Sequence, residues 1–211
     1  MRKMADSSKS KDGWGVECHP YPKGEASYIQ TRWDLCTGCG ICEIACSMFH
    51  FGVMNRELSR IRIYRYFTPL SKSVQAVCVQ CRDEERECEK ACPLDPPAIH
   101  YDKDLLHVNV DQDRCLGHKC GRCAEACGSS AIHFYPPTHD FAIVCDLCEK
   151  EGQRRPQCVE ACPAYALEFR GEKFPSYIER VPPEEKAEAL SQRLSPLRKD
   201  QVSSRWKEWL K

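Results

Sequence analysis

The chain has 211 residues, and its 31 basic and 31 acidic residues give a formal net charge of zero. This balance gives no reason to expect nucleic acid as a partner, and no apolar run reaches the ~18 residues that a membrane-spanning helix needs. Seventeen cysteines approach the content of a disulfide scaffold, yet the polar start of the sequence has no apolar signal region and no twin arginine. We therefore expect a cytoplasmic protein whose cysteines stay reduced and bind metal.

The first predicted elements follow a polar N-terminal extension, residues 1–30. Residues 59–67, SRIRIYRYF, alternate arginine with isoleucine or tyrosine, and this pattern predicts a half-exposed strand. Residues 98–110 hold two short alternating runs, AIHY and LLHVNV, separated by DKD, so they predict a hairpin. Residues 131–144, AIHFYPPTHDFAIV, predict a second hairpin.

The C-terminal extension, residues 176–211, differs in character from the rest of the chain. Pro182, the glutamates after it and the spaced leucines predict a helix that starts at this proline. Trp206, Trp209 and Leu210 would share one face of a further helix, which could pack on this chain or dock to a partner. Neither extension contributes to the cysteine repeat described next.

One short unit, Cys-x-x-Ala-Cys, occurs four times, as CEIAC, CEKAC, CAEAC and CVEAC. Each unit follows further cysteines, so that sixteen of the seventeen fall into four groups of four. Only Cys18 is left over, and we expect it to be a free thiol. In chain order the groups are Cys36, Cys39, Cys42, Cys46; Cys78, Cys81, Cys88, Cys92; Cys115, Cys120, Cys123, Cys127; and Cys145, Cys148, Cys158, Cys162.

The spacing of the first group, Cys-x2-Cys-x2-Cys-x3-Cys, is the bacterial four-iron spacing, in which the fourth cysteine ligates a neighbouring cluster. Structural zinc sites instead take two cysteine pairs with a longer separation. The third group, CLGHKCGRCAEAC, has the plant two-iron spacing over Cys115, Cys120 and Cys123, but that interpretation leaves Cys127 unexplained. The repeat favours a four-iron site whose loop contains two extra residues.

Several residues near the groups are candidates for adjusting a bound metal. The ring N–H of His118, inside the longer loop, could reach a cluster sulfur and raise its potential, or His118 could simply be exposed. No other histidine is expected to take part in the cysteine groups. Five basic residues could offset cluster charge or be ordinary solvated surface residues: Arg60, Arg62, Arg65, Lys119 and Arg122.

From about Arg32 to Gly171, the chain resembles the four-cluster iron–sulfur subunits of molybdenum and tungsten oxidoreductases, such as those of dimethyl sulfoxide reductase and formate dehydrogenase. The run CTGCGICEIACSMFHFGVMNRELSRIRIY resembles most closely the small subunits that accompany tungsten-pterin enzymes of the aldehyde oxidoreductase family, including benzoyl-CoA reductases. The third group departs from the family pattern by its two extra residues and by Gly128, where proline is commoner. This departure puts the potential and exposure of that cluster in doubt.

The resemblance implies an α+β fold of two nested bacterial-ferredoxin-like modules, each with two [4Fe-4S] clusters, surrounded by short hairpins and helices. The first module would comprise residues 31–75 and 140–175, and the inserted module residues 76–139. The N-terminal extension would precede them, and a helical C-terminal extension would follow.

The resemblance also implies four ligand sets, which we number as tetrads. The spacing alone does not distinguish this nesting from pairing in sequence order. The sets are tetrad 1, Cys36, Cys39, Cys42 and Cys162; tetrad 2, Cys46, Cys145, Cys148 and Cys158; tetrad 3, Cys78, Cys81, Cys88 and Cys127; and tetrad 4, Cys92, Cys115, Cys120 and Cys123.

The implied function is that of a non-catalytic subunit, which passes single electrons through four [4Fe-4S] clusters to or from a large tungsten- or molybdenum-pterin subunit. A flavin or ferredoxin-type electron carrier could be a further partner. The alternatives are a free-standing polyferredoxin, a subunit of a formate dehydrogenase or dimethyl sulfoxide reductase type of complex, and a zinc-based scaffold. Iron and sulfide content separates the last from the others, and co-purification separates the subunit from the free protein.

Overall fold

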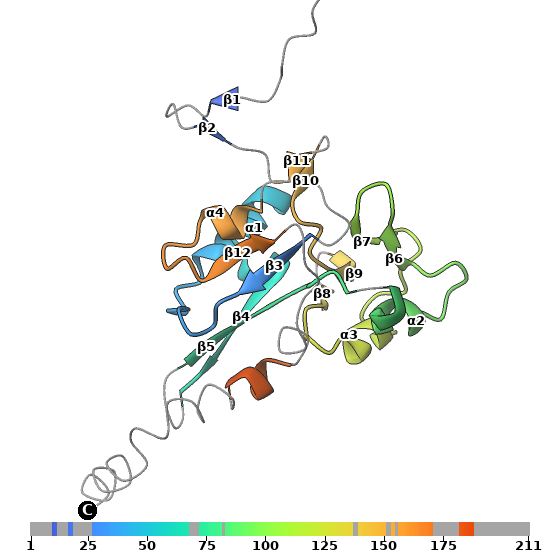
Figure 1. Cartoon of the computed structure of the whole chain (residues 1–211). Helices are drawn as coiled ribbons and strands as arrows, with labels where there is room; N and C mark the ends of the chain where they lie inside the picture. The colour runs from blue at the N-terminus through green and yellow to red at the C-terminus, as the bar shows by residue number, and fades with distance from the viewer. Residues whose placement is uncertain are drawn as a thin grey trace, which may run out of the picture.

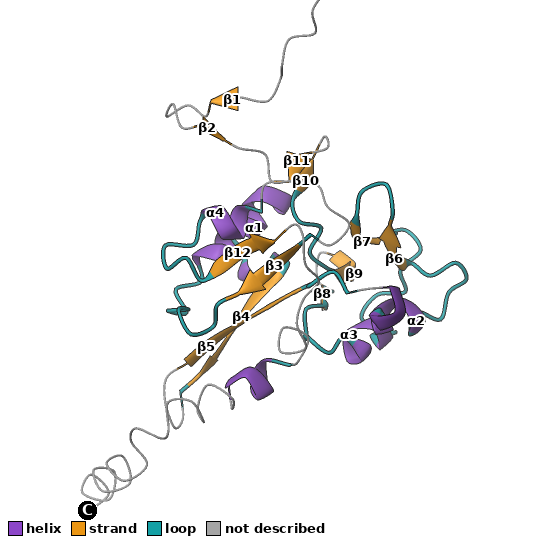
Figure 2. Ribbon diagram, in the orientation of Figure 1, coloured by secondary structure: helices purple, strands orange, loops and turns teal. Residues whose placement is uncertain are grey.

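The computed structural model describes residues 10–11, 17–18, 27–67, 72–81, 83–136, 139–150, 153–154, 156–170 and 182–187. Within these residues, short helices and six two-stranded antiparallel sheets alternate along the sequence (Figure 1). Figure 2 shows how much loop lies between them. This mixture of helices and strands confirms the expected α+β class.

The longest helix, α1 (Ile41–Phe51), lies directly after the first cysteines. It is flanked by Gly40 and Gly52, both in the left-handed conformation that glycine adopts without Cβ strain. Cys42 and Cys46 lie one turn apart on its buried side. α1 packs against α4 (Gln157–Glu160), which brings the first and last cysteine groups together (Figure 1).

Two strands from the ends of the cysteine-rich region pair beside these helices. β3 (Tyr28–Thr31) is antiparallel to β12 (Leu167–Arg170), with Ile29 opposite Phe169. β3 therefore lies across the expected boundary at residue 30. Nothing in the pattern of these four-residue strands announced this long-range pairing.

β4 (Ile61–Tyr66) and β5 (Lys72–Val77) form the longest hairpin. In β4, Ile61 and Ile63 are buried, and the residues between them are half-buried. The predicted strand over residues 59–67 is thereby confirmed. At the open end of the hairpin, the Lys72 ammonium group donates to the Ala187 carbonyl at 3.1 Å.

The other half of the molecule repeats the helix-and-hairpin arrangement. α2 (Glu87–Lys90) packs against α3 (Arg122–Ala126). Both predicted hairpins are confirmed, since β6 pairs with β7 and β8 pairs with β9. The four strands are β6 (Ile99–Asp102), β7 (His107–Val110), β8 (His133–Tyr135) and β9 (His139–Ile143).

The remaining elements are short and lie outside these two halves or between their parts. Residues 183–187 are helical, which confirms the start of the helix predicted after Pro182. The rest of that helix and the residues Trp206, Trp209 and Leu210 lie outside the described residues. Within the described part of the chain, no helix has the length and apolar character of a membrane span. The short elements are β1 (Ser10–Lys11), β2 (Glu17–Cys18), η1 (Arg56–Leu58), η2 (Asp83–Glu85), β10 (Glu149–Lys150) and β11 (Gln153–Arg154).

One hydrophobic core extends through both halves, and cysteines form part of it. Buried aliphatic residues such as Ile29, Ile61 and Val108 pack with the buried thiols of Cys46 and Cys145. The buried Gln80 side chain links the halves, since its amide donates to the Cys145 carbonyl at 2.8 Å and accepts the Val108 N–H at 2.7 Å. The metal-binding residues are therefore also structural residues.

His133 also links the halves, and it is buried in its neutral form. Its Nε2–H donates to the Ser59 carbonyl, and its Nδ1 has no partner among the described residues. Burial lowers the pKa of His133 to about 4, and Arg62 acts in the same direction. The unfolded protein, with a histidine pKa near ~6.5, therefore takes up a proton at a higher pH than the folded protein does.

We expect the folded protein to lose about 1 kcal/mol of stability through His133 between pH 7.5 and pH 5.5, because only the unfolded state is protonated there. The urea midpoint of the metal-loaded protein at the two pH values measures this loss. His133→Gln should reduce the difference between the two midpoints. His100→Gln, at a half-buried position of β6, should leave it; equal pH dependence in both variants would contradict the assignment.

Candidate metal centres

Tetrad 1 lies where α1, α4 and β12 meet. Cys36 and Cys39 precede α1, Cys42 is in its first turn, and Cys162 follows α4. All four line one hollow with about 310 Å³ of empty space, together with apolar side chains that include Ile63 and Leu167. The structure thus brings a cysteine from near the end of the described core to three cysteines near its start.

Tetrad 4 lies in the other half and has the same construction. Cys92 follows α2, whereas Cys115, Cys120 and Cys123 come from the longer loop and the start of α3. They line a hollow with about 350 Å³ of empty space, and Phe134 and other apolar side chains surround it.

The cysteines of tetrads 2 and 3 also gather from distant segments. In tetrad 2 the Cys158 thiol is influenced electrostatically by Cys145, Cys46 and Cys148, all of which add to the rise in its pKa that burial causes. In tetrad 3 the Cys78 thiol lies near Cys81, Cys88 and Cys127 in the same sense. The sixteen tetrad cysteines are all free thiols. Cys18 ends β2, and its side chain lies outside the described residues.

The last cysteine of each group, the one expected to cross to another cluster, has a hydrogen-bonding partner at its sulfur. The backbone N–H of Arg60 donates to Cys46 Sγ at 3.2 Å. Those of Ala98 and Ala166 donate to Cys92 Sγ and Cys162 Sγ, each at 3.3 Å. Cys127 Sγ lies 3.4 Å from the Ser129 hydroxyl. Such partners fix the side-chain direction and stabilise a thiolate.

The electrostatics of the tetrads favour metal ligands over reactive thiols. Burial raises the pKa of Cys42, Cys88 and Cys148 to about 12, and that of Cys123 to about 11. A nucleophilic or redox-active cysteine requires the opposite shift, toward the thiolate. A bound cation would displace the protons and compensate the charge of the clustered thiolates.

The spacing of the side chains does not match a single tetrahedral ion. Zinc with Zn–S bonds of ~2.3 Å brings its four sulfurs within about 4 Å of one another. Across the described ranges, the only set of at least three His, Cys, Asp or Glu ligand atoms lying within 4.8 Å of one another is His50, Asp146 and Cys148. The cysteine tetrads are therefore wider than a zinc site and leave room for a larger group, so they fit iron–sulfur clusters.

A buried carboxylate fixes the first turn of α1 beside tetrad 1. Glu43 accepts the Ile63 N–H at 3.0 Å and the Arg56 Nε–H at 2.8 Å, and it lies 3.5 Å from the Arg65 guanidinium. Arg65 also donates to the Gly38 carbonyl, in the loop between Cys36 and Cys39. These contacts tie the tetrad 1 loop to β4.

We expect Glu43→Ala to cost about 3 kcal/mol of folding free energy, because it leaves a buried N–H and two arginines without their acceptor. The urea midpoint for loss of cluster absorbance measures this cost. Glu57→Ala is the matched control, since Glu57 pairs with Arg62 at 3.0 Å but is 61% exposed, and it should cost less than about 1 kcal/mol. A similar small loss in both variants would contradict the assignment.

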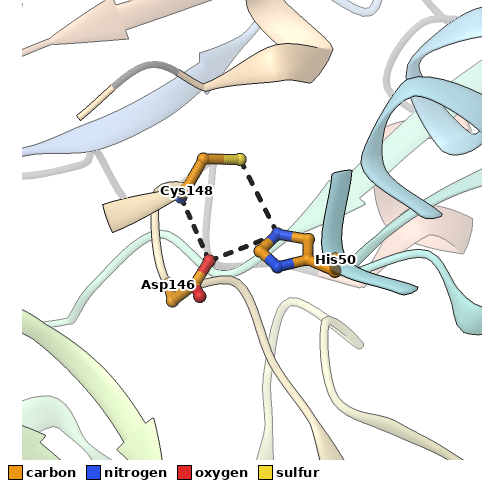
Figure 3. A group of neighbouring side chains, drawn as sticks. All are labelled: His50, Asp146 and Cys148. Atoms are coloured by element: carbon orange, nitrogen blue, oxygen red, sulfur yellow. Dashed lines mark hydrogen bonds and ion pairs between the residues drawn. The ribbon is translucent and has the colours of Figure 1, made fainter. Parts of the chain in front are cut away.

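Three polar side chains surround one edge of tetrad 2 (Figure 3). His50 Nε2 lies 3.7 Å from Cys148 Sγ and 3.4 Å from Asp146 Oδ1. Asp146 also accepts the Cys148 N–H at 3.0 Å and pairs with the Arg60 guanidinium at 2.6 Å. Burial lowers the pKa of His50 to about 4, so its ring is neutral near pH 7.

The expectation that no histidine other than His118 takes part in the cysteine groups is wrong at His50. His50 follows Cys46 by four residues on α1, and this helical spacing is the signal that would have found it. Asp146 directly follows Cys145, as Glu43 follows Cys42, and an acidic residue directly after a cysteine is a second signal of the same kind.

His118 fastens its loop to a strand instead of approaching a cluster sulfur. Its backbone N–H and its ring Nδ1 both lie 2.8 Å from Asp140 Oδ1 on β9. A Cβ at the neighbouring Gly117, whose φ is +71°, would lie 2.3 Å from the same carboxylate. The two extra residues of the third group thus hold its loop on β9. Lys119 and Arg122 are exposed.

The surface at tetrad 1 is exposed and largely apolar. Cys39 is the one exposed cysteine among the sixteen of the tetrads. Near it in the sequence or in the hollow's rim, Leu35, Ile41 and Tyr165 are exposed. Tyr165 has a φ of +51°, as does Ser130 at the corresponding position after Cys127. An aromatic side chain exposed at a strained position indicates a contact outside this chain.

The fold and the tetrads define the chain as a cysteine-ligated metalloprotein. No protein-family model matches it. The polyferredoxin-like subunit of an aliphatic sulfonate oxidoreductase from Pyrococcus furiosus is 36% identical over 138 residues, covering 65% of this chain and 72% of that protein. Two Escherichia coli proteins are also similar: the putative electron transport protein YsaA, 33% identical over 63% of this chain and 82% of its own length, and a subunit of anaerobic dimethyl sulfoxide reductase, 34% identical over 64% and 68%.

This protein therefore belongs to the family of polyferredoxin-like, electron-transfer iron–sulfur subunits of oxidoreductases. Among solved structures, it is similar to one polypeptide of the active site complex BamBC of benzoyl coenzyme A reductase, with a TM-score of 0.38 and 23% identity over 86% of this chain and 97% of that one.

Proposed function

We propose that the chain carries four [4Fe-4S] clusters, one on each tetrad, and passes single electrons among them. The observation that carries this proposal is that each tetrad joins three cysteines of one group to the last cysteine of another. The hollows at tetrads 1 and 4, with about 310 and 350 Å³ of empty space, support it. The third group then holds a four-iron cluster, and Cys127 ligates its neighbour.

The same pairing supports two nested modules. Residues 31–75 and 140–175 form the first, which holds tetrads 1 and 2. Residues 76–139 form the inserted module, which holds tetrads 3 and 4. The packing of α1 on α4 and of α2 on α3 matches this division. Residues 1–30 and 176–211 are extensions of the modules.

When bound, the clusters supply one-electron redox chemistry. The chain's own residues hold them through cysteine sulfurs and shield them from water with apolar side chains. Hydrogen-bond donors such as the Ala98 and Ala166 N–H groups stabilise the ligating sulfurs. Sixteen thiols that must remain reduced favour a cytoplasmic location.

We propose that the chain is not catalytic by itself and serves a large tungsten- or molybdenum-pterin subunit, of the aldehyde oxidoreductase and benzoyl-CoA reductase family. The sequence resemblance and the subunit names of the relatives support this assignment. The apolar surface at Cys39 suits contact with another protein. A flavin or ferredoxin-type carrier would exchange electrons elsewhere on the chain.

Anaerobic reductive titration tests the function. The purified chain should take up about four electrons, and its EPR spectrum should show interacting four-iron clusters. In its native host it should co-purify with a large pterin-containing subunit. If it migrates alone under native conditions, it is a free-standing polyferredoxin. If it takes up no electrons, electron transfer is not its role.

A further inference from the structure

Three of the four tetrads have an acidic residue directly after one of their cysteines, and in each case an arginine pairs with it. Glu43 pairs with Arg56 beside tetrad 1, and Glu89 lies 3.4 Å from Arg86 beside tetrad 3. Beside tetrad 2, Asp146 pairs with Arg60 at 2.6 Å. The cysteines of tetrad 4 are followed by uncharged residues, Pro93, Leu116, Gly121 and Ala124.

The pair at tetrad 2 has the most direct contact with ligating residues. Arg60 donates its backbone N–H to Cys46 Sγ at 3.2 Å, and Asp146 accepts the N–H of Cys148 at 3.0 Å. Both side chains are largely buried, with 18% and 20% exposure. The Arg60 Nε–H is buried and has no acceptor among the described residues, so hydrogen bonding within the described structure does not fully account for this guanidinium.

We propose that Arg60 and Asp146 set the midpoint potential of the cluster held by tetrad 2, Arg60 raising it and Asp146 lowering it. This proposal rests on the proposed function, because it requires a cluster at that tetrad. It assigns to one charge pair the control of one step in the relay.

The opposite signs follow from the charge of the cluster. Reduction adds one negative charge to a group that already carries about two when its four ligands are thiolates. A nearby cation therefore favours the reduced form, and a nearby anion favours the oxidised form. Both effects are large in a buried site, where the effective dielectric constant is far below that of water. The neighbouring His50 is neutral and leaves the pair as the local charges.

The internal repeat removes one competing explanation for a difference between clusters. Backbone N–H groups donate to the last cysteine of the second and fourth groups in the same way, at 3.3 Å each. These repeated donors influence clusters on different tetrads alike, and unrepeated side chains such as Arg60 and Asp146 distinguish them.

EPR-monitored redox titration of the anaerobically loaded chain tests the proposal, and a Cys148→Ser variant identifies the component that belongs to tetrad 2. Arg60→Gln should lower the reduction equilibrium constant of that component at least tenfold, which is about 59 mV for one electron. Asp146→Asn should raise it by a similar factor. The double variant should return to within about threefold of the wild type, because its local charge is again balanced.

Two controls separate charge from structure. Arg62→Gln is matched, since Arg62 has 15% exposure and pairs with Glu57 at 3.0 Å on the neighbouring strand β4, and it should leave the component in place. Arg60→Lys keeps the charge and should stay within about threefold. If Arg60→Gln fails to load a cluster, Asp146→Asn decides alone.

The proposal is overturned if Asp146→Asn leaves the component unmoved, or if both single variants shift it in the same direction. Iron and sulfide are measured in the same samples. A wild-type chain without them would overturn the proposed function, whereas fully loaded variants with unmoved potentials overturn only the role of the charge pair.

Discussion

Cys162→Ala should disturb the same cluster as Cys39→Ala, although 123 residues separate the two positions. Both cysteines line the hollow of tetrad 1, so loss of either removes a ligand from one cluster. We expect each variant to lose between about one and four irons and the same EPR component, because a cubane with three ligands loses one iron or the whole cluster. Iron analysis and EPR of the reduced proteins measure both effects.

Cys120→Ala and Cys18→Ser are the comparisons for this experiment. Cys120→Ala should remove a different component, that of tetrad 4, and Cys18→Ser should leave the iron content unchanged. Pairing of the cysteine groups in sequence order predicts otherwise: Cys162→Ala would then remove the component that Cys120→Ala or its group removes. That result would contradict the nested arrangement.

Removal of iron should unfold most of the chain. Buried cysteines such as Cys78, Cys123 and Cys158 belong to the core, and without metal the hollows at tetrads 1 and 4 lose their contents. Structural metal sites in small domains contribute on the order of 10 kcal/mol, which is comparable to the whole stability of a typical domain. The metal therefore decides whether the fold is stable.

Far-UV circular dichroism and urea titration before and after anaerobic chelation measure this loss. The stripped protein should lose its cooperative urea transition, and reconstitution with iron and sulfide should restore it. A stripped protein that keeps both its circular dichroism spectrum and a cooperative transition would show that the aliphatic core is sufficient.

Local patterns in the sequence were enough to predict the local structure. The alternation in residues 59–67 and in the two predicted hairpins reports which side chains are buried on a strand, and these elements were confirmed. The repeat of Cys-x-x-Ala-Cys assigned Cys127 to a metal site even though its group has an irregular loop. Both signals lie within a few residues of one another in the sequence.

Contacts between distant segments could not be predicted in the same way. The pairing of β3 with β12 joins two four-residue strands that carry no mark of their partner. The contact of Asp146 with Arg60 depends on how β4 packs near the fourth cysteine group. His118 was noticed for its place in a metal loop, but Asp140, its partner, lies 22 residues further along the sequence.

The central claim is that each of the four tetrads holds a [4Fe-4S] cluster. Quantification of iron and acid-labile sulfide in the anaerobically purified protein tests it most directly. The account predicts about sixteen irons and about sixteen sulfides per molecule, from four clusters of four irons each. Zinc without sulfide, or about half that iron after complete reconstitution, would contradict it.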